Sequence, residues 1–553
     1  MFQSIMATSL MNLHNFTDTI YRNTTAMERS NQKRYVEIMD TTLRDGEQTS
    51  GVAYTASEKL NIAKMLLEEV RVDRIEIASA RISEGEYDAV SKIVKWADQH
   101  GYLERVEILG FVDENRSLDW IAGAGGKVVN LLCKGSVKHL QGQLRKTADE
   151  HINDIRKAIS YATALGISVN VYFEDWSNGM RNSSEYVFKL MEALRDEPIR
   201  RFMLPDTLGV LSPDEAYTFM QKMVDNFPGK HFDFHAHNDY DLSVANCFSA
   251  VKAGAKGLHV TVNGLGERAG NTPLSSVIAV LKDHLKADFS VDESTLCSAS
   301  KLVEVFSGVA VPANKPVIGE HVFTQTCGVH ADGDNKGNLY YNELMPERFG
   351  RTRKYALGKT SGNASIRKNL EEIGIELDPE SLRKVTQRVV ELGDKKENIT
   401  TEDLPYIISD VLGREALQEK IKIRNYYSSH VFNLKPVATL SIEINGEVYE
   451  ATSTGDGQYD AFMQALKSIY DRLGKRLPQL LNYKISIPPG GRTDAFVETI
   501  ITWGLEDKQF KTRGFESDQQ AAAITATIKM LNLIEGEVGA SKETIRTREK
   551  VIN

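Results

Sequence analysis

The amino-acid sequence predicts an α/β protein in which a (β/α)8 TIM barrel is followed by a helical connecting subdomain and a C-terminal α+β domain. Between about residues 35 and 285, eight short β-rich segments alternate with helix-length segments, which is the pattern of that barrel. A doubly wound sheet would rarely need eight such units. After the barrel the pattern changes, first to helices and then to hairpins followed by helices.

The eight predicted strands are short and rich in β-branched and aromatic residues. They are YVEIMDTTL (35–43), RIEIAS (74–79), VEILGF (106–111), KVVNLL (127–132), SVNVYF (168–173), RFMLPD (201–206), FDFHAH (232–237) and GLHVTV (257–262). The segments between them, such as SPDEAYTFMQKMV (212–224), have the period of helices. Because active sites on this fold lie at the carboxyl ends of the strands, the polar residues there are candidate functional groups.

Four regions are predicted along the chain. They are a disordered N-terminal tail (1–33), the barrel domain (34–302), connecting subdomains (303–428) and the C-terminal domain (429–553). In the last region Asn445-Gly446 joins two alternating segments, which predicts a β-hairpin, and a helix follows. Strands and a helix then recur, so we expect a duplicated ββα domain that could bind a ligand between its halves.

The composition is typical of a globular cytoplasmic protein. The 553 residues are 41% hydrophobic and 26% charged with a net charge of -9, which argues against nucleic acid or an anionic membrane as the main partner. No apolar run approaches the roughly 18 residues of a membrane span, and the N-terminus lacks the pattern of a signal peptide. Cys133, Cys247, Cys297 and Cys327 show no CxxC spacing, so neither a disulfide framework nor a zinc-thiolate site is expected.

Two histidines in the seventh predicted strand indicate a metal site. His235 and His237 are two positions apart, so their imidazoles face the same side of the strand. Asp45 at the end of the first strand and Asn271 after the eighth could reach them across the barrel mouth. Such a mixed N/O site with open positions suits Mn²⁺, Mg²⁺ or catalytic Zn²⁺. The alternatives are a satisfied or surface histidine pair and an ordinary loop carboxylate.

Other polar residues at the strand ends fit carbonyl chemistry. Arg44 offers a fork of donors to an oxyanion or a carboxylate, Glu174 is a candidate acid or base, and Thr207 could hold a carboxylate oxygen. If a 2-oxo acid chelates a metal ion here, the metal and these polar residues together imply polarisation of the acid's carbonyl group. Claisen condensation, aldol cleavage and carboxyl transfer all fit, and the residues alone leave that choice open.

Six motifs carry a resemblance to a known family. They are DTTLRDGEQ, LPDTLGV, HAHND, NGLGERAGN, TCGVHADG and GDGQYDAF. With them, nearly the whole chain after residue 34 resembles the α-isopropylmalate, homocitrate and citramalate synthases. The resemblance implies an acyltransferase that condenses the methyl group of acetyl-CoA with a 2-oxo acid at a divalent metal, and then hydrolyses the thioester to release CoA. It also implies a homodimer with a C-terminal regulatory domain.

The resemblance assigns roles to individual residues. It places the metal ligands on Asp45, His235 and His237 with Asn271 close by, the catalytic groups on Arg44 and Glu174, and the acceptor carboxylate contact on Thr207. It implies that the connecting segment enters the partner subunit's site, where His330 assists methyl deprotonation and Asp332, Asn338, Leu339 and Tyr340 contact acetyl-CoA.

The acceptor is predicted from three positions around its R group. Leu109, Leu132 and Tyr172 resemble the pyruvate pocket of the citramalate subgroup, where bulky side chains leave room for little more than a methyl. Pyruvate is therefore the predicted acceptor and (R)-citramalate, on the route to isoleucine, the predicted product. The alternatives are that the three are ordinary core residues and that the acceptor is 2-oxoisovalerate, as in 2-isopropylmalate synthesis for leucine. Homocitrate synthesis and a metal-dependent acyl-CoA lyase are less favoured.

The resemblance also predicts a feedback site in the C-terminal domain, for isoleucine or alternatively leucine. The matching positions are Tyr459, Asp460, Leu480, Tyr483, Ile487, Thr493, Val497 and Gln519. The alternative is that this domain serves only in dimerisation.

Overall fold

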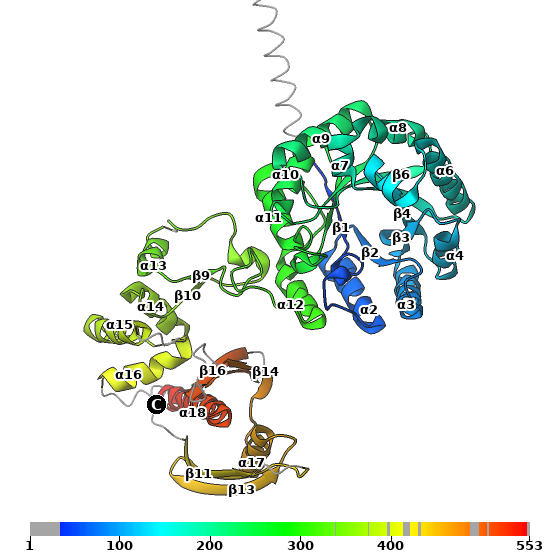
Figure 1. The fold of residues 1–553 in the computed structure, drawn as a ribbon. Helices are drawn as coiled ribbons and strands as arrows, with labels where there is room; N and C mark the ends of the chain where they lie inside the picture. The colour runs from blue at the N-terminus through cyan, green and yellow to red at the C-terminus, as the bar shows by residue number, and fades with distance from the viewer. Residues whose placement is uncertain are drawn as a thin grey trace, which may run out of the picture. The chain divides into compact units, whose positions relative to one another are not determined.

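A closed barrel of eight parallel strands forms the N-terminal part of the protein in this computed structural model (Figure 1). The structure describes residues 34–337, 339–373, 375–394, 399–412, 421–429, 433–486, 497–505 and 508–549. The barrel strands are β1 (Glu37–Asp40), β2 (Arg74–Ser79), β3 (Val106–Phe111), β4 (Val128–Lys134), β5 (Ser168–Glu174), β6 (Ile199–Asp206), β7 (Phe232–Ala236) and β8 (Gly257–Val260). Each strand pairs with the next and β8 pairs with β1, so the predicted TIM barrel is confirmed.

Helices surround this barrel, and several of them begin where the sequence supplies a cap. They are α2 (Ala56–Lys64), α3 (Glu84–His100), α4 (Arg116–Gly123), α5 (Val137–His139), α6 (Ala148–Ala164), α7 (Trp176–Asn182), α8 (Ser184–Leu194), α9 (Pro213–Asn226), α10 (Ser243–Ala253), α11 (Leu274–Leu285) and α12 (Leu296–Ser307). Helices α2, α6 and α9 each start with a capping box, in which a Thr or Ser and the Glu three residues later satisfy each other's backbone N–H groups.

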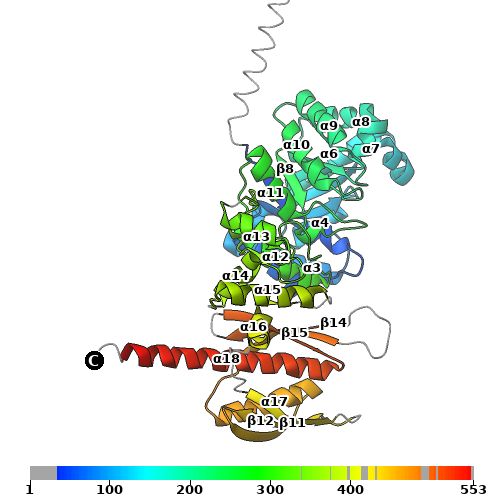
Figure 2. The ribbon, with the colours of Figure 1, turned by 90° about the vertical axis from the view of Figure 1, so that its left-hand side faces the viewer.

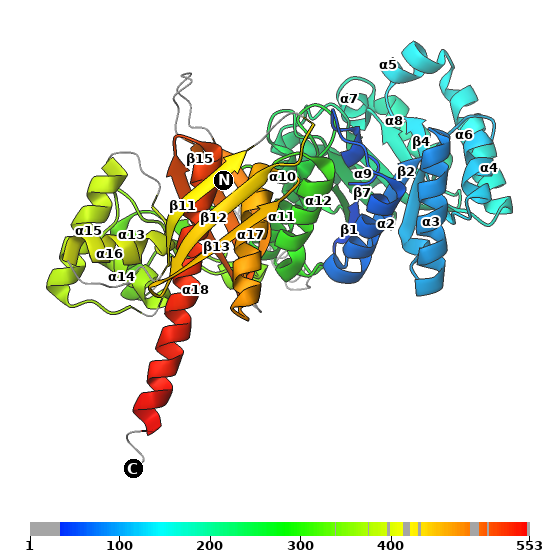
Figure 3. The same cartoon turned by 90° about the horizontal axis from the view of Figure 1, so that it is seen from below.

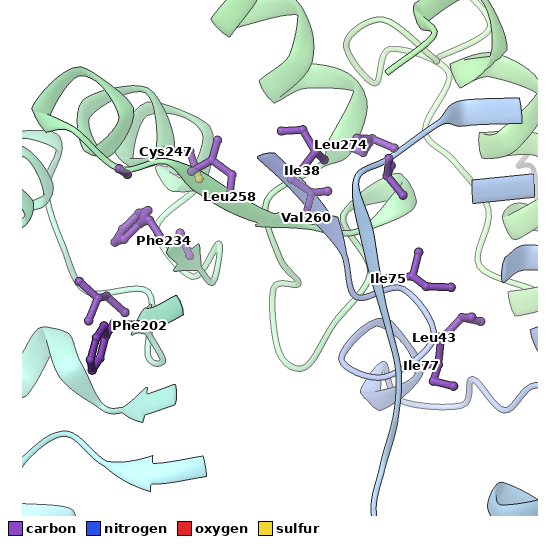
Figure 4. Packing of buried hydrophobic residues seen from close by; sticks show 14 of the residues in the cluster. Ile38, Leu43, Ile75, Ile77, Phe202, Phe234, Cys247, Leu258, Val260 and Leu274 are labelled. Carbon is purple, nitrogen blue, oxygen red and sulfur yellow. The ribbon is translucent and has the colours of Figure 1, made fainter. Parts of the chain in front are cut away.

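The main hydrophobic core lies between the barrel strands and these helices. Figure 4 shows Ile38, Leu258 and Val260 on neighbouring strands, with Cys247 of α10 and Leu274 of α11 near them. Because successive strand residues point to opposite faces, the residues between these apolar ones point into the barrel. Many of those inward residues are charged or polar, so the barrel interior is suited to chemistry as well as packing.

The chain forms two compact units. The first holds the described residues up to Thr324 together with Tyr341–Arg353, and the second holds Gln325–Tyr340 and the described residues from Lys354 onward. The connecting elements are β9 (Thr324–Gln325), α13 (Gly328–Asn335), β10 (Lys354–Tyr355), α14 (Asn363–Glu372), α15 (Pro379–Asp394) and α16 (Leu404–Leu412). Among the helices that the structure describes, none is both long and apolar enough to cross a membrane. The predicted tail (1–33) lies outside the described residues, and the domain boundaries stay predictions.

The C-terminal part contains two antiparallel three-stranded sheets, each followed by a helix. The first half is β11 (Ile421–Ser429), β12 (Val437–Ile444), β13 (Glu447–Thr454) and α17 (Gln458–Arg472), and the second is β14 (Gln479–Ser486), β15 (Val497–Leu505), β16 (Lys508–Glu516) and α18 (Gln519–Glu549). Figure 3 shows β11, β12 and β13 side by side, and Figure 2 shows α17 and α18 between the two sheets. Residues of both halves share one hydrophobic core.

The predicted duplication is present, but its repeat is βββα instead of ββα. Strand β11 was missed, and it pairs with β12 along its length, so a boundary at residue 429 would leave this strand outside its own sheet. Its sequence IKIRNYYSS is mostly polar after the first three residues, and most of its side chains are exposed, which weakens the alternation. The predicted turn at Asn445-Gly446 is present, and both residues have positive φ angles of 52° and 89°.

Candidate active site

Three side chains that could hold a metal ion meet at the carboxyl end of the barrel. Asp45 follows β1, His235 lies in β7 and His237 comes directly after that strand. Oδ2 of Asp45 lies 3.5 Å from Nε2 of His235 and 3.9 Å from Nε2 of His237. The possible ligand atoms all lie within 4.8 Å of one another, and the three residues are buried. The structure therefore brings together the three ligands that the sequence predicted.

The chemistry of these groups fits a divalent metal ion. Oδ1 of Asp45, Oδ1 of Asn271 and Nδ1 of both histidines are buried with no hydrogen-bond partner within the described part of the chain. Asn271 pairs with His237 through a β-bridge, and its amide nitrogen donates to the carbonyl of Leu265 at 3.0 Å, which leaves the amide oxygen available. Burial lowers the pKa of both histidines, so their ring nitrogens keep the lone pairs that a metal needs. Such a donor set suits Mn²⁺, Mg²⁺ or Zn²⁺.

Arg44 lies directly beside this cluster. Its Nη1 donates to Oδ2 of Asp45 at 2.9 Å and its Nε donates to Oε2 of Glu76 at 2.6 Å. Burial acts to raise the pKa of Asp45, but the positive charge of Arg44 holds that pKa well below its usual range. The aspartate is therefore ionised and ready to bind a cation. The guanidinium keeps further N–H groups that can point at a bound ligand.

The sequence analysis missed the polar network that supports Arg44. Glu76 of β2 is fully buried and also accepts from Thr41 at 2.7 Å and from the amide of Asn130 at 2.8 Å. Asn170 in turn donates to Asn130 at 2.9 Å. Each of the residues 76, 130 and 170 is a polar residue in the middle of an apolar strand, and that was the signal available in the sequence. These contacts cross from β2 to β5 and hold the guanidinium in one place.

The three residues predicted to surround the acceptor's R group belong to one small apolar cluster inside the barrel. Leu109 and Tyr172 are buried in it, and Leu132 packs against it partly exposed. The cluster also contains Met39, Met203 and Phe111, which the sequence analysis did not single out. The ring of Tyr172 lies 5.9 Å from the Arg44 guanidinium and 6.1 Å from the His235 ring. Tyr172 therefore borders both the apolar cluster and the candidate metal ligands.

Glu174 and Thr207 lie at the same end of the barrel. Glu174 ends β5 and forms an ion pair with Lys134, its register partner at the end of β4. Thr207 follows β6, and its hydroxyl oxygen accepts from the backbone N–H of Asp175 at 2.9 Å. That hydroxyl can still donate to a carboxylate. Lys134 was not singled out from the sequence, although its position two residues after Leu132 places it on the inward face.

The predicted acetyl-CoA residues lie in the second compact unit. The ring of His330 in α13 packs on Tyr340 with centroids 4.1 Å apart, and its Nδ1 lies 3.2 Å from Oε1 of Gln325. Oδ2 of Asp332 accepts from Lys336 at 2.7 Å. Leu339 and Tyr340 are 70% and 42% exposed. Asn338 lies outside the described residues.

The predicted feedback residues lie around the start of α17, on the second sheet and at the start of α18. The rings of Tyr459 and Tyr483 are 5.4 Å apart, the Tyr459 hydroxyl lies 2.7 Å from that of Thr527, and Tyr483 hydrogen-bonds Gln519. Val497 is buried and Leu480 is exposed. Asp460 accepts from the backbone N–H of Asp456 at 2.8 Å, so it closes the loop at the helix start. Ile487 and Thr493 fall outside the described residues.

Comparison with known sequences gives matches over nearly all of the chain. The HMGL-like family matches residues 35–303, the homocitrate synthase post-HMGL domain-like family residues 317–397, and the LeuA allosteric (dimerisation) domain residues 398–535.

Individual relatives match along most of their own length. A Methanopyrus kandleri protein named provisionally as an (R)-citramalate synthase is 36% identical over 84% of this chain and 89% of its own. A second protein of that organism, named provisionally as a 2-isopropylmalate synthase, is also 36% identical, over 90% and 98%. The (R)-citramalate synthase of Methanocaldococcus jannaschii is 33% identical over 90% and 99%.

Proposed function

The chain belongs to the family of acyltransferases that contains the citramalate and 2-isopropylmalate synthases, and from this premise we propose that it condenses acetyl-CoA with pyruvate to give (R)-citramalate and CoA. The observation that carries pyruvate as the acceptor is the apolar cluster beside the metal-binding residues. Leu109, Leu132 and Tyr172 lie in that cluster with Met39 and Met203. Large side chains at these positions leave a small space for the acceptor's R group and exclude a branched chain by steric overlap.

The residues at the barrel mouth bind and orient the acceptor. Asp45, His235 and His237, with Asn271 close by, would hold a divalent ion that polarises the carbonyl of the 2-oxo acid. Thr207 donates its hydroxyl proton to the acceptor's carboxylate. Arg44, held by Glu76 and Asp45, directs N–H groups at the oxygen that gains negative charge as the new C–C bond forms.

The proton transfers are assigned to a histidine and a glutamate. His330 of a partner subunit removes a proton from the acetyl methyl group, and the resulting carbon attacks the acceptor's carbonyl carbon. Glu174, oriented by Lys134, takes a proton from the water that then cleaves the thioester and releases CoA. Exposure of Leu339 and Tyr340 supports a segment that packs against acetyl-CoA in another subunit together with Asp332 and Asn338.

The C-terminal domain is proposed to bind isoleucine as a feedback inhibitor, with leucine as the alternative. The two tyrosines Tyr459 and Tyr483 provide a ring-lined surface between α17 and the second sheet, and Gln519 provides a polar contact there. The match to a domain described as allosteric and dimerising supports both this role and a homodimer.

A 2-isopropylmalate synthase is the second candidate, because a relative named for that activity is as similar as the first citramalate relative. The test is CoA release from acetyl-CoA in Mn²⁺ or Mg²⁺ with pyruvate, 2-oxoisovalerate or 2-oxoglutarate as acceptor. We expect pyruvate to have the highest kcat/KM by at least about tenfold. A preference for 2-oxoisovalerate would contradict the proposed acceptor and keep the reaction type.

A further inference from the structure

A chain of buried hydrogen bonds runs from the predicted acceptor pocket along the inside of the barrel. The Tyr172 hydroxyl lies 2.6 Å from Nδ1 of His259, and Nε2 of His259 lies 3.1 Å from Oδ2 of Asp233. Arg74 and His231 donate to the same carboxylate at 2.6 Å and 2.9 Å. Tyr172, His259 and Asp233 come from β5, β8 and β7 and are all buried. The proposed mechanism gives His259 and Asp233 no part.

His259 has a hydrogen-bond partner on each side of its ring. Nε2 lies against Oδ2 of Asp233, a carboxylate that also accepts from Arg74, and Nδ1 lies against the Tyr172 hydroxyl. His259 therefore links the Tyr172 hydroxyl to a carboxylate that other side chains hold in place.

This bond restrains the ring that borders the pocket. The ring of Tyr172 belongs to the cluster with Leu109 and Met203, and it also lies near the His235 ring and the Arg44 guanidinium. A buried hydroxyl without an acceptor is unfavourable, so ring positions that keep the bond to His259 are strongly preferred. The height of the ring in the barrel, and with it the space left beside the metal-binding residues, depends on His259.

We propose that His259 is a positioning residue for acceptor selectivity, because it holds the Tyr172 ring where the pocket admits only a methyl group. This inference rests on the proposed function, since it requires the 2-oxo acid to bind between the metal-binding residues and the apolar cluster. His259 acts through Tyr172 and does not touch the substrate. Without the hydrogen bond to His259, the Tyr172 ring gains freedom to move, and a longer 2-oxo acid fits.

The test compares pyruvate with 2-oxobutyrate, which is longer by one methylene. In Tyr172→Phe and His259→Phe the ratio of kcat/KM for 2-oxobutyrate to that for pyruvate should rise at least about fivefold, because one methylene in a tight pocket is worth roughly 10–200-fold. The double variant should give the ratio of Tyr172→Phe alone, since both changes remove the same bond.

His231→Gln is the matched control. It removes another partner of Asp233 and leaves the bond between Tyr172 and His259, so the ratio should stay at the wild-type value. Equal losses of kcat/KM for both acceptors in the phenylalanine variants would indicate a general structural defect and overturn the inference. If His259→Phe does not fold, Tyr172→Phe alone provides the test. An unchanged ratio of kcat/KM for 2-oxobutyrate to that for pyruvate in this variant would overturn the inference. The proposed function is judged separately, on the acceptor preference of the unmodified enzyme.

Discussion

Nε of Arg44 donates to Oε2 of Glu76 across 2.6 Å, and the Glu76 carboxylate is fully buried. The same carboxylate accepts from Thr41 and Asn130, so both of its oxygens are occupied. A buried ion pair of this kind costs desolvation and is weak evidence for stability. Its consequence here is geometric, because it fixes the plane of the guanidinium beside Asp45.

Glu76→Gln should therefore lower kcat, and it should also cost up to about 3–5 kcal/mol of stability because the buried Arg44 charge loses a partner. The amide keeps the size of the side chain but loses the charge that orients Arg44, so we expect kcat to fall roughly 10–100-fold. Glu107→Gln is the control, because Glu107 is equally buried but pairs with Arg74 instead. Steady-state kinetics of both variants decide the matter. Equal kcat losses in the two would contradict a specific role for Glu76.

Asp45→Asn should abolish tight metal binding. The change removes the only negative charge of the cluster and leaves two neutral imidazoles, so the Kd for Mn²⁺ should rise by more than the roughly 10–100-fold typical of a lost supporting contact. Calorimetric titration of metal-stripped protein measures this directly. Asp206→Asn is the control, since Asp206 is buried at the end of β6 and caps the backbone N–H groups of Val210 and Leu211. Unchanged Mn²⁺ affinity in Asp45→Asn would exclude this site.

Leu132→Ala should widen the acceptor pocket. Removing this partly exposed side chain frees volume in the inward cluster, so the kcat/KM ratio of 2-oxoisovalerate to pyruvate should rise about tenfold or more. Leu131→Ala is matched in strand and chemistry, but Leu131 packs in the core outside the barrel. That variant should lose about 2–5 kcal/mol of stability and keep the wild-type ratio. A raised kcat/KM ratio in Leu131→Ala and an unchanged ratio in Leu132→Ala would contradict the assignment of Leu132 to the acceptor pocket.

Asp40→Asn should change how stability depends on pH. Burial raises the pKa of Asp40 to about 7, whereas in the unfolded chain it is roughly 4. Ionisation therefore disfavours folding, so wild-type stability is lost as pH rises from about 4 to 7. The asparagine side chain does not ionise, so the variant keeps its stability over this pH range. At pH 8 its free energy of unfolding should exceed that of the wild type by up to roughly 4 kcal/mol, and at pH 4 the ionisation should make no difference. Denaturant unfolding at both pH values is the measurement, and a pH-independent difference would contradict it.

Tyr483→Ala should weaken feedback inhibition. The change removes the ring that faces Tyr459 and its hydrogen bond to Gln519, so the isoleucine concentration for half inhibition should rise at least about tenfold. Tyr449→Ala removes a tyrosine of the first sheet whose hydroxyl bonds Glu447, and it should leave the inhibition curve unchanged. If leucine inhibits the enzyme and isoleucine does not, leucine is the ligand of this site. Equal inhibition of Tyr483→Ala and wild type would argue against the site.

The predicted elements were accurate where local pattern decides structure. Each barrel strand lies within or close to its predicted segment, and the predicted helical segment 212–224 overlaps α9. Strand β11 was missed because its exposed, mostly polar sequence lacks alternation, and pairing with β12 supplies its stability instead. Tertiary contacts override weak local preference in such strands.

The proximity of the three candidate metal ligands could be predicted because motif and strand-end position coincide. Glu76, Asn130 and His259 were not, although each is a polar residue inside an apolar strand. Alternation alone predicts that they face inward, but not which groups they meet. The strand register and closure of the barrel decide that Glu76 meets Arg44 and that Tyr172 meets His259, which is 87 residues away in the chain.

The sequence by itself determined the eight strands, the helical segments between them and the inward direction of the candidate functional side chains. These properties depend on a two-residue pleat and on contacts within one helical turn, and both are local. Only the tertiary structure decided which inward groups are neighbours, such as Arg74 and Asp233, which lie 159 residues apart and 2.6 Å from each other. Distances across the barrel depend on the tilt and stagger of all eight strands together, and no short stretch of sequence contains that information.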